Sequence, residues 1–134
     1  MDIHEGGCHC GAVRFRVAVD RYQALECNCS MCRKKALLHL IVPRDRFTLL
    51  AGADQLTAYR FNTGVAQHTF CRVCGIHPFY VPRSHPNDID VNVRCLDGDA
   101  AARFTVAPFD GANWEANVAA IRGQGDEGAK TKDE

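Results

Sequence analysis

The chain has 134 residues, and its 16 basic and 16 acidic side chains give a formal net charge of zero. A chain of this length predicts one domain, and the neutral balance argues against a broad positive surface for nucleic acid or an anionic membrane. The unusual part of its composition is eight cysteines, seven of which fall into three short clusters.

Residues 1–7 have neither the basic region nor the apolar region of a secretory signal. The longest apolar stretch, residues 36–42, is interrupted by His39 and is far shorter than the ~20 residues that span a bilayer. We therefore expect a cytoplasmic protein without a membrane partner. In a reducing compartment, cysteine clusters bind metal or carry redox chemistry more often than they form disulfides.

The first cluster, Cys8-His9-Cys10, leads directly into a predicted strand over residues 11–19. Alternate positions of that segment are apolar, which is typical of a half-buried strand. The apolar face consists of Val13, Phe15, Val17 and Val19. The two cysteines therefore stand at the entrance of the strand.

The second cluster is Cys27-Asn28-Cys29-Ser30-Met31-Cys32, a C-x-C-x-x-C triplet. We predict a single helical turn over residues 30–35, with Ser30 as its N-cap. Cys32 would then lie near a helix N-terminus, where the helix dipole favours a thiolate.

The third cluster, Cys71-Arg72-Val73-Cys74-Gly75, has the form of a zinc knuckle, in which glycine permits the turn that aims amide groups at sulfur. Short apolar runs predict further strands, and residues 113–122 predict a helix with Asn113 as cap. The strands are expected at residues 37–42, 45–50, 56–61, 76–81 and 89–94, and residues 66–70 lead into the third cluster. This pattern favours a mainly β fold organised around metal, with one zinc-binding domain over residues 1–122 and a disordered tail over 123–134.

Metal binding is the interpretation that best suits paired thiols one or two residues apart. Structural disulfides are the first alternative, but neighbours in a C-x-C cannot close on each other without strain. Thiol redox chemistry without metal is the second, but a redox C-x-x-C needs a βαβ context that the pattern lacks.

Two pairs of thiols supply four ligands, which makes a closed tetrahedral zinc site. We assign Cys8 and Cys10 to this site together with Cys71 and Cys74. We expect a structural site, because four thiolates leave no vacant position and the metal joins the first strand to the second half of the chain. The alternative is a redox or transport metal.

The triplet supplies three ligands and leaves one position open, as in catalytic zinc sites. We predict that Cys27, Cys29 and Cys32 bind a second zinc and are the catalytic residues, with a substrate thiol as the soft fourth ligand. The alternative is that a fourth protein ligand closes the site. The candidates are Cys95 first, and then His39, His68 and His77.

Basic side chains near the triplet are candidates for binding the carboxylates of a substrate. Arg33 and Lys34 follow Cys32 directly, and Arg83 lies in a proline-flanked polar loop. A guanidinium suits a carboxylate, although a run of charges is as easily a solvated helix face. His77 is a candidate acid or base, or a packed histidine.

The combined motifs resemble the glutathione-dependent formaldehyde-activating enzyme family over about residues 6–115. The segments that carry the resemblance are Gly7–Phe15, Cys27–Lys34, Phe70–Gly75 and Val91–Asp97. Within the family, residues 61–63, 66–71 and 79–84, together with Lys34-Lys35 and Cys95, look closest to the centromere protein V branch.

The resemblance implies small stacked antiparallel sheets of the zinc-ribbon-like β-tent kind with a short C-terminal helix, and two zinc ions per chain on the cysteines assigned above. It also implies a carbon–sulfur lyase with glutathione as co-substrate, whose namesake activity joins glutathione and formaldehyde reversibly as S-hydroxymethylglutathione. We therefore predict a zinc-dependent carbon–sulfur lyase acting on a thiol adduct, and the resemblance implies that the thiol is glutathione. The alternative is a non-catalytic zinc module that binds glutathione or a protein partner.

Overall fold

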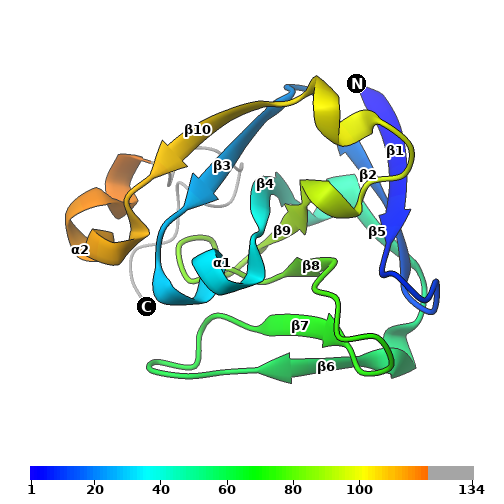
Figure 1. Ribbon diagram of the computed structural model, residues 1–134, viewed down its shortest axis with the longest axis horizontal. Coiled ribbons are helices and arrows are strands. Elements are labelled where there is room, and N and C mark those ends of the chain that lie inside the picture. Colours follow the sequence, from blue (N-terminus) through cyan, green and yellow to red (C-terminus); the bar gives the residue numbers. More distant parts are fainter. Residues whose placement is uncertain (121–134) are drawn as a thin grey trace.

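The computed structural model describes residues 1–120 and consists of three small β-sheets with short helices between them (Figure 1). An antiparallel three-stranded sheet has the order β1-β2-β5, with β1 at Asp2–Gly7, β2 at Arg14–Val19 and β5 at Phe47–Ala51. A hairpin is formed by β6, Leu56–Tyr59, and β7, His68–Cys71.

The largest sheet has five strands in the order β10-β3-β4-β9-β8. Its strands are β10 (Thr105–Phe109), β3 (Gln23–Cys27), β4 (Leu38–Pro43), β9 (Asp88–Asn92) and β8 (Phe79–Tyr80). Every pair is antiparallel except β10 and β3, which run parallel with Phe109 opposite Cys27. Both strands of that pair therefore end at the same edge of the sheet, next to the triplet.

The core lies between the three-stranded and five-stranded sheets. Phe15 and Val17 of β2 are fully buried, as is Val91 of β9. Every residue of β4 and β9 is buried on both faces, so these two strands form the centre of the molecule. Burial of each such aliphatic or aromatic side chain contributes about 1.5–3 kcal/mol.

Two helices lie at the ends of strands of the large sheet. Helix α1, Ser30–Lys35, connects β3 to β4 and faces the β6–β7 hairpin (Figure 1). Near the C-terminal end of the described residues, α2 spans Trp114–Asn117 between two short 3₁₀ turns, Gly111–Asn113 and Val118–Ala120. Within the described part of the chain, no helix is long and apolar enough to cross a membrane.

The expected mainly β fold of small sheets is confirmed, and the alternation over residues 11–19 gives β2 with its predicted buried face. Four strands were not anticipated, namely β1, β3, β7 and β10. β1 contains two glycines, β10 contains a proline and is largely exposed, and β3 is short. The predicted helix over 113–122 is shorter and partly 3₁₀, and its last two residues and the tail at 123–134 lie outside the described residues.

Candidate metal centres and the adjoining pocket

Four thiols from two distant segments meet beside the three-stranded sheet. The sulfur atoms of Cys8, Cys10, Cys71 and Cys74 all lie within 4.8 Å of one another. The Cys10 sulfur is 3.7 Å from those of Cys8 and Cys71. Four sulfurs bonded to one zinc at 2.3 Å stand about 3.8 Å apart, so the cluster has the dimensions of a tetrahedral thiolate site.

The local backbone supports this four-cysteine cluster. Gly75 adopts a positive φ of 82°, and its amide donates to the Cys71 carbonyl at 2.8 Å. The Val13 amide donates to Cys8 Sγ at 3.3 Å, and the Ile76 amide donates to the Cys74 sulfur. Amide donors of this kind stabilise thiolates and orient them toward a metal.

The triplet is built at the point where β3 passes into α1. Cys27 is the last residue of β3, Cys29 is the N-cap of α1, and Cys32 lies in its first turn. The Cys29 sulfur accepts a hydrogen bond from the Cys32 amide at 3.3 Å, so Cys29 takes the capping role that we predicted for Ser30. A short sulfur-capped helix thus gathers the three thiols.

The pKa values of the three triplet thiols indicate that a bound cation would stabilise their ionised forms. Hydrogen bonds with Cys27 and Cys32 lower the pKa of Cys29 to about 2. Hydrogen bonding with Cys29 raises the pKa of Cys27, and hydrogen bonding with Cys27 and Cys29 raises the pKa of Cys32 far above the usual range. One sulfur therefore ionises easily, whereas three adjacent thiolates need a bound positive charge.

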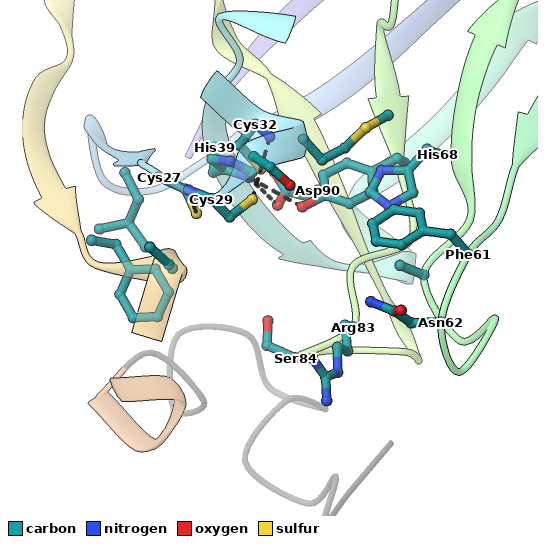
Figure 2. Close-up of a pocket in the computed structure, with 18 of the residues that line it drawn as sticks. Cys27, Cys29, Cys32, His39, Phe61, Asn62, His68, Arg83, Ser84 and Asp90 are labelled. Atoms are coloured by element: carbon teal, nitrogen blue, oxygen red, sulfur yellow. Dashed lines mark hydrogen bonds and ion pairs between the residues drawn. The ribbon is translucent and has the colours of Figure 1, made fainter. Parts of the chain in front are cut away.

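A buried histidine and a carboxylate lie beside these thiols (Figure 2). A ring nitrogen of His39, on β4, lies within 4.8 Å of the Cys27 and Cys32 sulfurs. His39 Nδ1 is 2.6 Å from Asp90 Oδ2, on β9, and 3.4 Å from the Tyr80 hydroxyl. Both His39 and Asp90 are almost completely buried.

The other candidates for a fourth ligand lie elsewhere. The Cys95 sulfur contacts the Asn92 side-chain amide and the His77 carbonyl. Burial first, and then the charges of Cys8 and Cys74, raises the pKa of Cys95 to about 11. Cys95 is therefore a neighbour of the four-cysteine cluster. The Nδ1 of His77 is 3.1 Å from the Thr69 carbonyl oxygen.

His68 is held in an aromatic stack. Its ring lies between Phe61 and Tyr80, with centroids 5.3 Å and 5.0 Å away and the rings nearly parallel. Lys35 Nζ is 3.1 Å from His68 Nδ1 and stands over the Tyr80 ring. Burial first, and then the charge of Lys35, lowers the pKa of His68 to about 4.

A pocket of about 460 Å³ opens onto the triplet. Its lining includes the three cysteines, His39 and Asp90 on one side, and Arg83 and Ser84 on another (Figure 2). Leu25, Ile41, Phe61 and Phe109 supply apolar surface.

The basic residues predicted for substrate binding divide into two groups. Arg83 lines the pocket. Arg33 and Lys34 are exposed and are absent from its lining, and Arg33 borders a separate hollow with Pro108 and Asp110. The next residue, Lys35, turns inward instead, and the sequence pattern did not distinguish it from its two neighbours.

A backbone segment after β10 closes one side of the triplet. The Asn28 side chain accepts a hydrogen bond from the Ala112 amide at 2.8 Å and donates one to Asp110 at 3.0 Å. Gly111 is buried between them, and a methyl group there would overlap the Cys27 sulfur. This close approach requires glycine, and no sequence pattern indicated it because the two segments are distant along the chain.

The donor sets suit zinc. Thiolates are soft ligands, which favour zinc over magnesium or calcium. All eight cysteines are free of disulfides, and His39 Nε2 is a buried nitrogen without a hydrogen-bond partner among residues 1–120. Both clusters therefore could hold a metal ion, the first on four sulfurs and the second on sulfur and nitrogen.

A family model described as glutathione-dependent formaldehyde-activating enzyme matches residues 3–110. The chain belongs to this family. The membership confirms the assignment made from the three cysteine motifs.

Two relatives place the family membership in context. A curated protein of Halomonas elongata, whose name assigns it provisionally to the glutathione-dependent formaldehyde-activating enzymes, is 38% identical over 79 residues. That alignment covers 52% of this chain and 50% of the relative, so the chain spans about half the length of the relative. A crystal structure of a Rhodobacter sphaeroides protein is 38% identical with a TM-score of 0.66, and the match covers 70% of this chain and 88% of the other.

Proposed function

We propose that this chain is a zinc-dependent carbon–sulfur lyase that acts on a thiol adduct of glutathione, with chemistry of the S-hydroxymethylglutathione type. Family membership supports glutathione and formaldehyde as the reactants. The observation that carries the proposal is the pocket, because its wall contains Cys27, Cys29 and Cys32 and its volume of about 460 Å³ admits a small molecule.

The cysteines divide into a structural and a reactive set in this proposal. Cys8, Cys10, Cys71 and Cys74 hold a structural zinc away from the pocket. The triplet holds a second zinc, which when bound would supply a soft Lewis acid that stabilises a sulfur substrate as its thiolate. The pocket side chains then position the rest of the substrate.

Arg83 is the basic residue that we propose for a glutathione carboxylate, because it is the predicted one that lines the pocket. Arg33 and Lys34 are exposed outside the pocket lining, so they stay candidates only for contacts with a part of the substrate that extends beyond the pocket. The apolar wall of Leu25, Ile41 and Phe109 reduces the access of water to the reacting carbon.

The reaction balances without an oxidant or reductant. In the forming direction the glutathione sulfur adds to the formaldehyde carbon, the carbonyl π electrons move to oxygen, and the thiol proton ends on that oxygen. In the cleaving direction the carbon–sulfur bond breaks, the carbonyl reforms and the sulfur recovers a proton.

Metal analysis and exchange NMR test the proposal together. We expect two zinc ions per chain and a faster interconversion of glutathione, formaldehyde and their adduct than without protein. Cys29→Ser should remove this acceleration while the fold and the first zinc persist. Cys95→Ser is the matched control, because Cys95 contacts Asn92 and His77 away from the triplet, and it should retain the acceleration.

A non-catalytic zinc module is the second candidate, and the position of His39 beside the triplet favours it, since a histidine ligand would close the site. Glutathione binding measured by calorimetry, without any acceleration of the exchange, would decide for the module and against the lyase.

A further inference from the structure

We propose that His39 Nε2 is the fourth ligand of the metal at the triplet, and that Asp90 is the positioning residue that holds the imidazole in place. This inference rests on the proposed second zinc site. It replaces an open three-thiolate centre by a resting centre of three sulfurs and one nitrogen.

The first argument is distance. A ring nitrogen of His39 and the sulfurs of Cys27 and Cys32 all lie within 4.8 Å of one another. Ligand atoms of a tetrahedral zinc stand about 3.5–3.8 Å apart, so small side-chain movements bring these three to one ion. The Cys29 sulfur, at the cap of α1, interacts with the sulfurs of Cys27 and Cys32. It lies outside the group that is within 4.8 Å of the His39 nitrogen, so it would have to move further than the other three to reach the same ion.

The second argument is the unsatisfied nitrogen. His39 Nδ1 lies 2.6 Å from Asp90 Oδ2, so the Nδ1–H group donates a hydrogen bond to the carboxylate and the lone pair stays on Nε2. Nε2 is buried and has no hydrogen-bond partner among the described residues. An unsatisfied buried nitrogen destabilises the folded state, and a bond to a metal removes this penalty.

The third argument is the carboxylate. Zinc-bound histidines commonly donate their other ring N–H to a carboxylate, which fixes the tautomer and the ring orientation. Asp90 is 1% exposed and His39 6%. A buried carboxylate is unfavourable unless it is paired, and the nearby charge of Lys35 together with a metal behind His39 would compensate it.

The rival ligands are occupied or distant. Cys95 belongs to the surroundings of the four-cysteine cluster, and His68 is stacked between two rings with Lys35 at its Nδ1. His39 therefore combines a ring nitrogen that has no hydrogen-bond partner among the described residues with a position beside the triplet sulfurs. A thiol substrate then has to displace Nε2 or enter as an additional ligand.

X-ray absorption at the zinc edge tests the assignment on the full-length zinc-loaded protein. We expect a mean of about three and a half sulfurs and one half nitrogen per zinc, with the outer-shell scattering of an imidazole ring. His39→Gln should remove that scattering. His68 is a buried histidine of the same pocket, and His68→Gln should leave the scattering unchanged.

Asp90→Asn keeps the side-chain volume and tests the positioning role even if His39→Gln does not fold. We expect about 10–100-fold weaker zinc binding at the second site, measured by competition with a chelator, and unchanged binding at the first. Equal affinity in wild type and Asp90→Asn would refute the role of Asp90.

The outcomes separate this inference from the proposed function. One zinc per chain in the wild type would remove the second site and with it the proposed lyase. Two zinc ions without imidazole scattering, or with scattering that survives His39→Gln, would leave the lyase standing and overturn the ligand assignment.

Discussion

At the scale of single residues, Gly111 sets a tight steric limit on the triplet. Its backbone lies so close to the Cys27 sulfur that no side chain fits, and Asn28 fixes the segment through Ala112 and Asp110. The position of the Cys27 sulfur therefore depends on a residue that has no side chain.

Gly111→Ala should displace the Cys27 sulfur and lower zinc occupancy at the second site, with the first zinc retained. The reason is the overlap of the new methyl group with that sulfur. Zinc analysis of the purified variant measures this directly. Gly98→Ala is a control, because its methyl group meets open space and only the left-handed backbone is strained, at about 1–2 kcal/mol. Full zinc occupancy in Gly111→Ala would contradict the steric argument.

The proximity of the thiols within each motif was predictable from spacing, because thiols one to three residues apart must lie close together in any fold. The partner residues were not. His39 and Asp90 lie on different strands and meet only through the β4–β9 pairing, in which Ile41 stands opposite Asp90. No local pattern encodes such a contact, so His39 was one of four candidates for a fourth ligand, and Asp90 was not among them.

At the scale of elements, the three consecutive basic residues of helix α1 lie in different environments. Arg33 and Lys34 are exposed, while Lys35 reaches over Tyr80 to His68. Burial lowers the pKa of Lys35, and the thiols and Asp90 oppose that effect. The helix thus presents one cation to the interior beside a cluster of sulfurs.

Lys35→Met should raise the pKa of His68 from about 4 toward, but not to, 6.5, because burial is the larger cause and the charge of Lys35 the second. NMR titration of the histidine ring measures it. Lys34→Met removes an equal charge from the exposed face and should leave the value unchanged. A His68 pKa that is equal in both variants would show that Lys35 does not act on it.

The same pKa predicts how stability depends on pH. The unfolded chain binds a proton at His68 near pH 6.5, whereas the folded protein resists it until about pH 4. The free energy of unfolding should therefore fall as the pH decreases from 6.5 to 4. The loss of unfolding free energy between pH 7 and pH 5, measured by urea unfolding, should be smaller in Lys35→Met than in Lys34→Met. An equal loss in the two variants would contradict the role of Lys35.

At the scale of the whole molecule, the four-cysteine cluster joins segments that are 61 positions apart, from Cys10 to Cys71. The strands that carry the triplet and His39 lie within the enclosed segment. Loss of the first metal should therefore release the second, while loss of the second should leave the first in place.

The variants Cys74→Ser and Cys29→Ser test the loss of the first metal and the loss of the second metal separately. Structural zinc contributes on the order of 10 kcal/mol to small domains, so Cys74→Ser should unfold the chain and lose both metals. Cys29→Ser should lose only the second zinc and keep the cooperative thermal transition. Circular dichroism with metal analysis measures both, and a folded Cys74→Ser protein with an intact second site would show that the two centres are independent.

The general architecture was predictable because the alternating strand at residues 11–19 and the buried runs at 37–42 and 89–94 are dictated by burial. The parallel β3–β10 pair was not, since β10 is exposed and contains Pro108, which removes a backbone donor. That pair exists through the docking of distant segments, and it is the one that brings Gly111 to the triplet.

The separation of the two cysteine pairs along the chain also has a consequence during synthesis on the ribosome. Ribosomes add about 5–20 residues per second, so the first pair waits roughly 3–12 s for Cys71 to be made. The thiols of the triplet emerge within the same interval, before β9 and its Asp90 exist. During this interval Cys8 and Cys10 lack their two partner thiols, and exposed thiols are the ones that oxidise most readily.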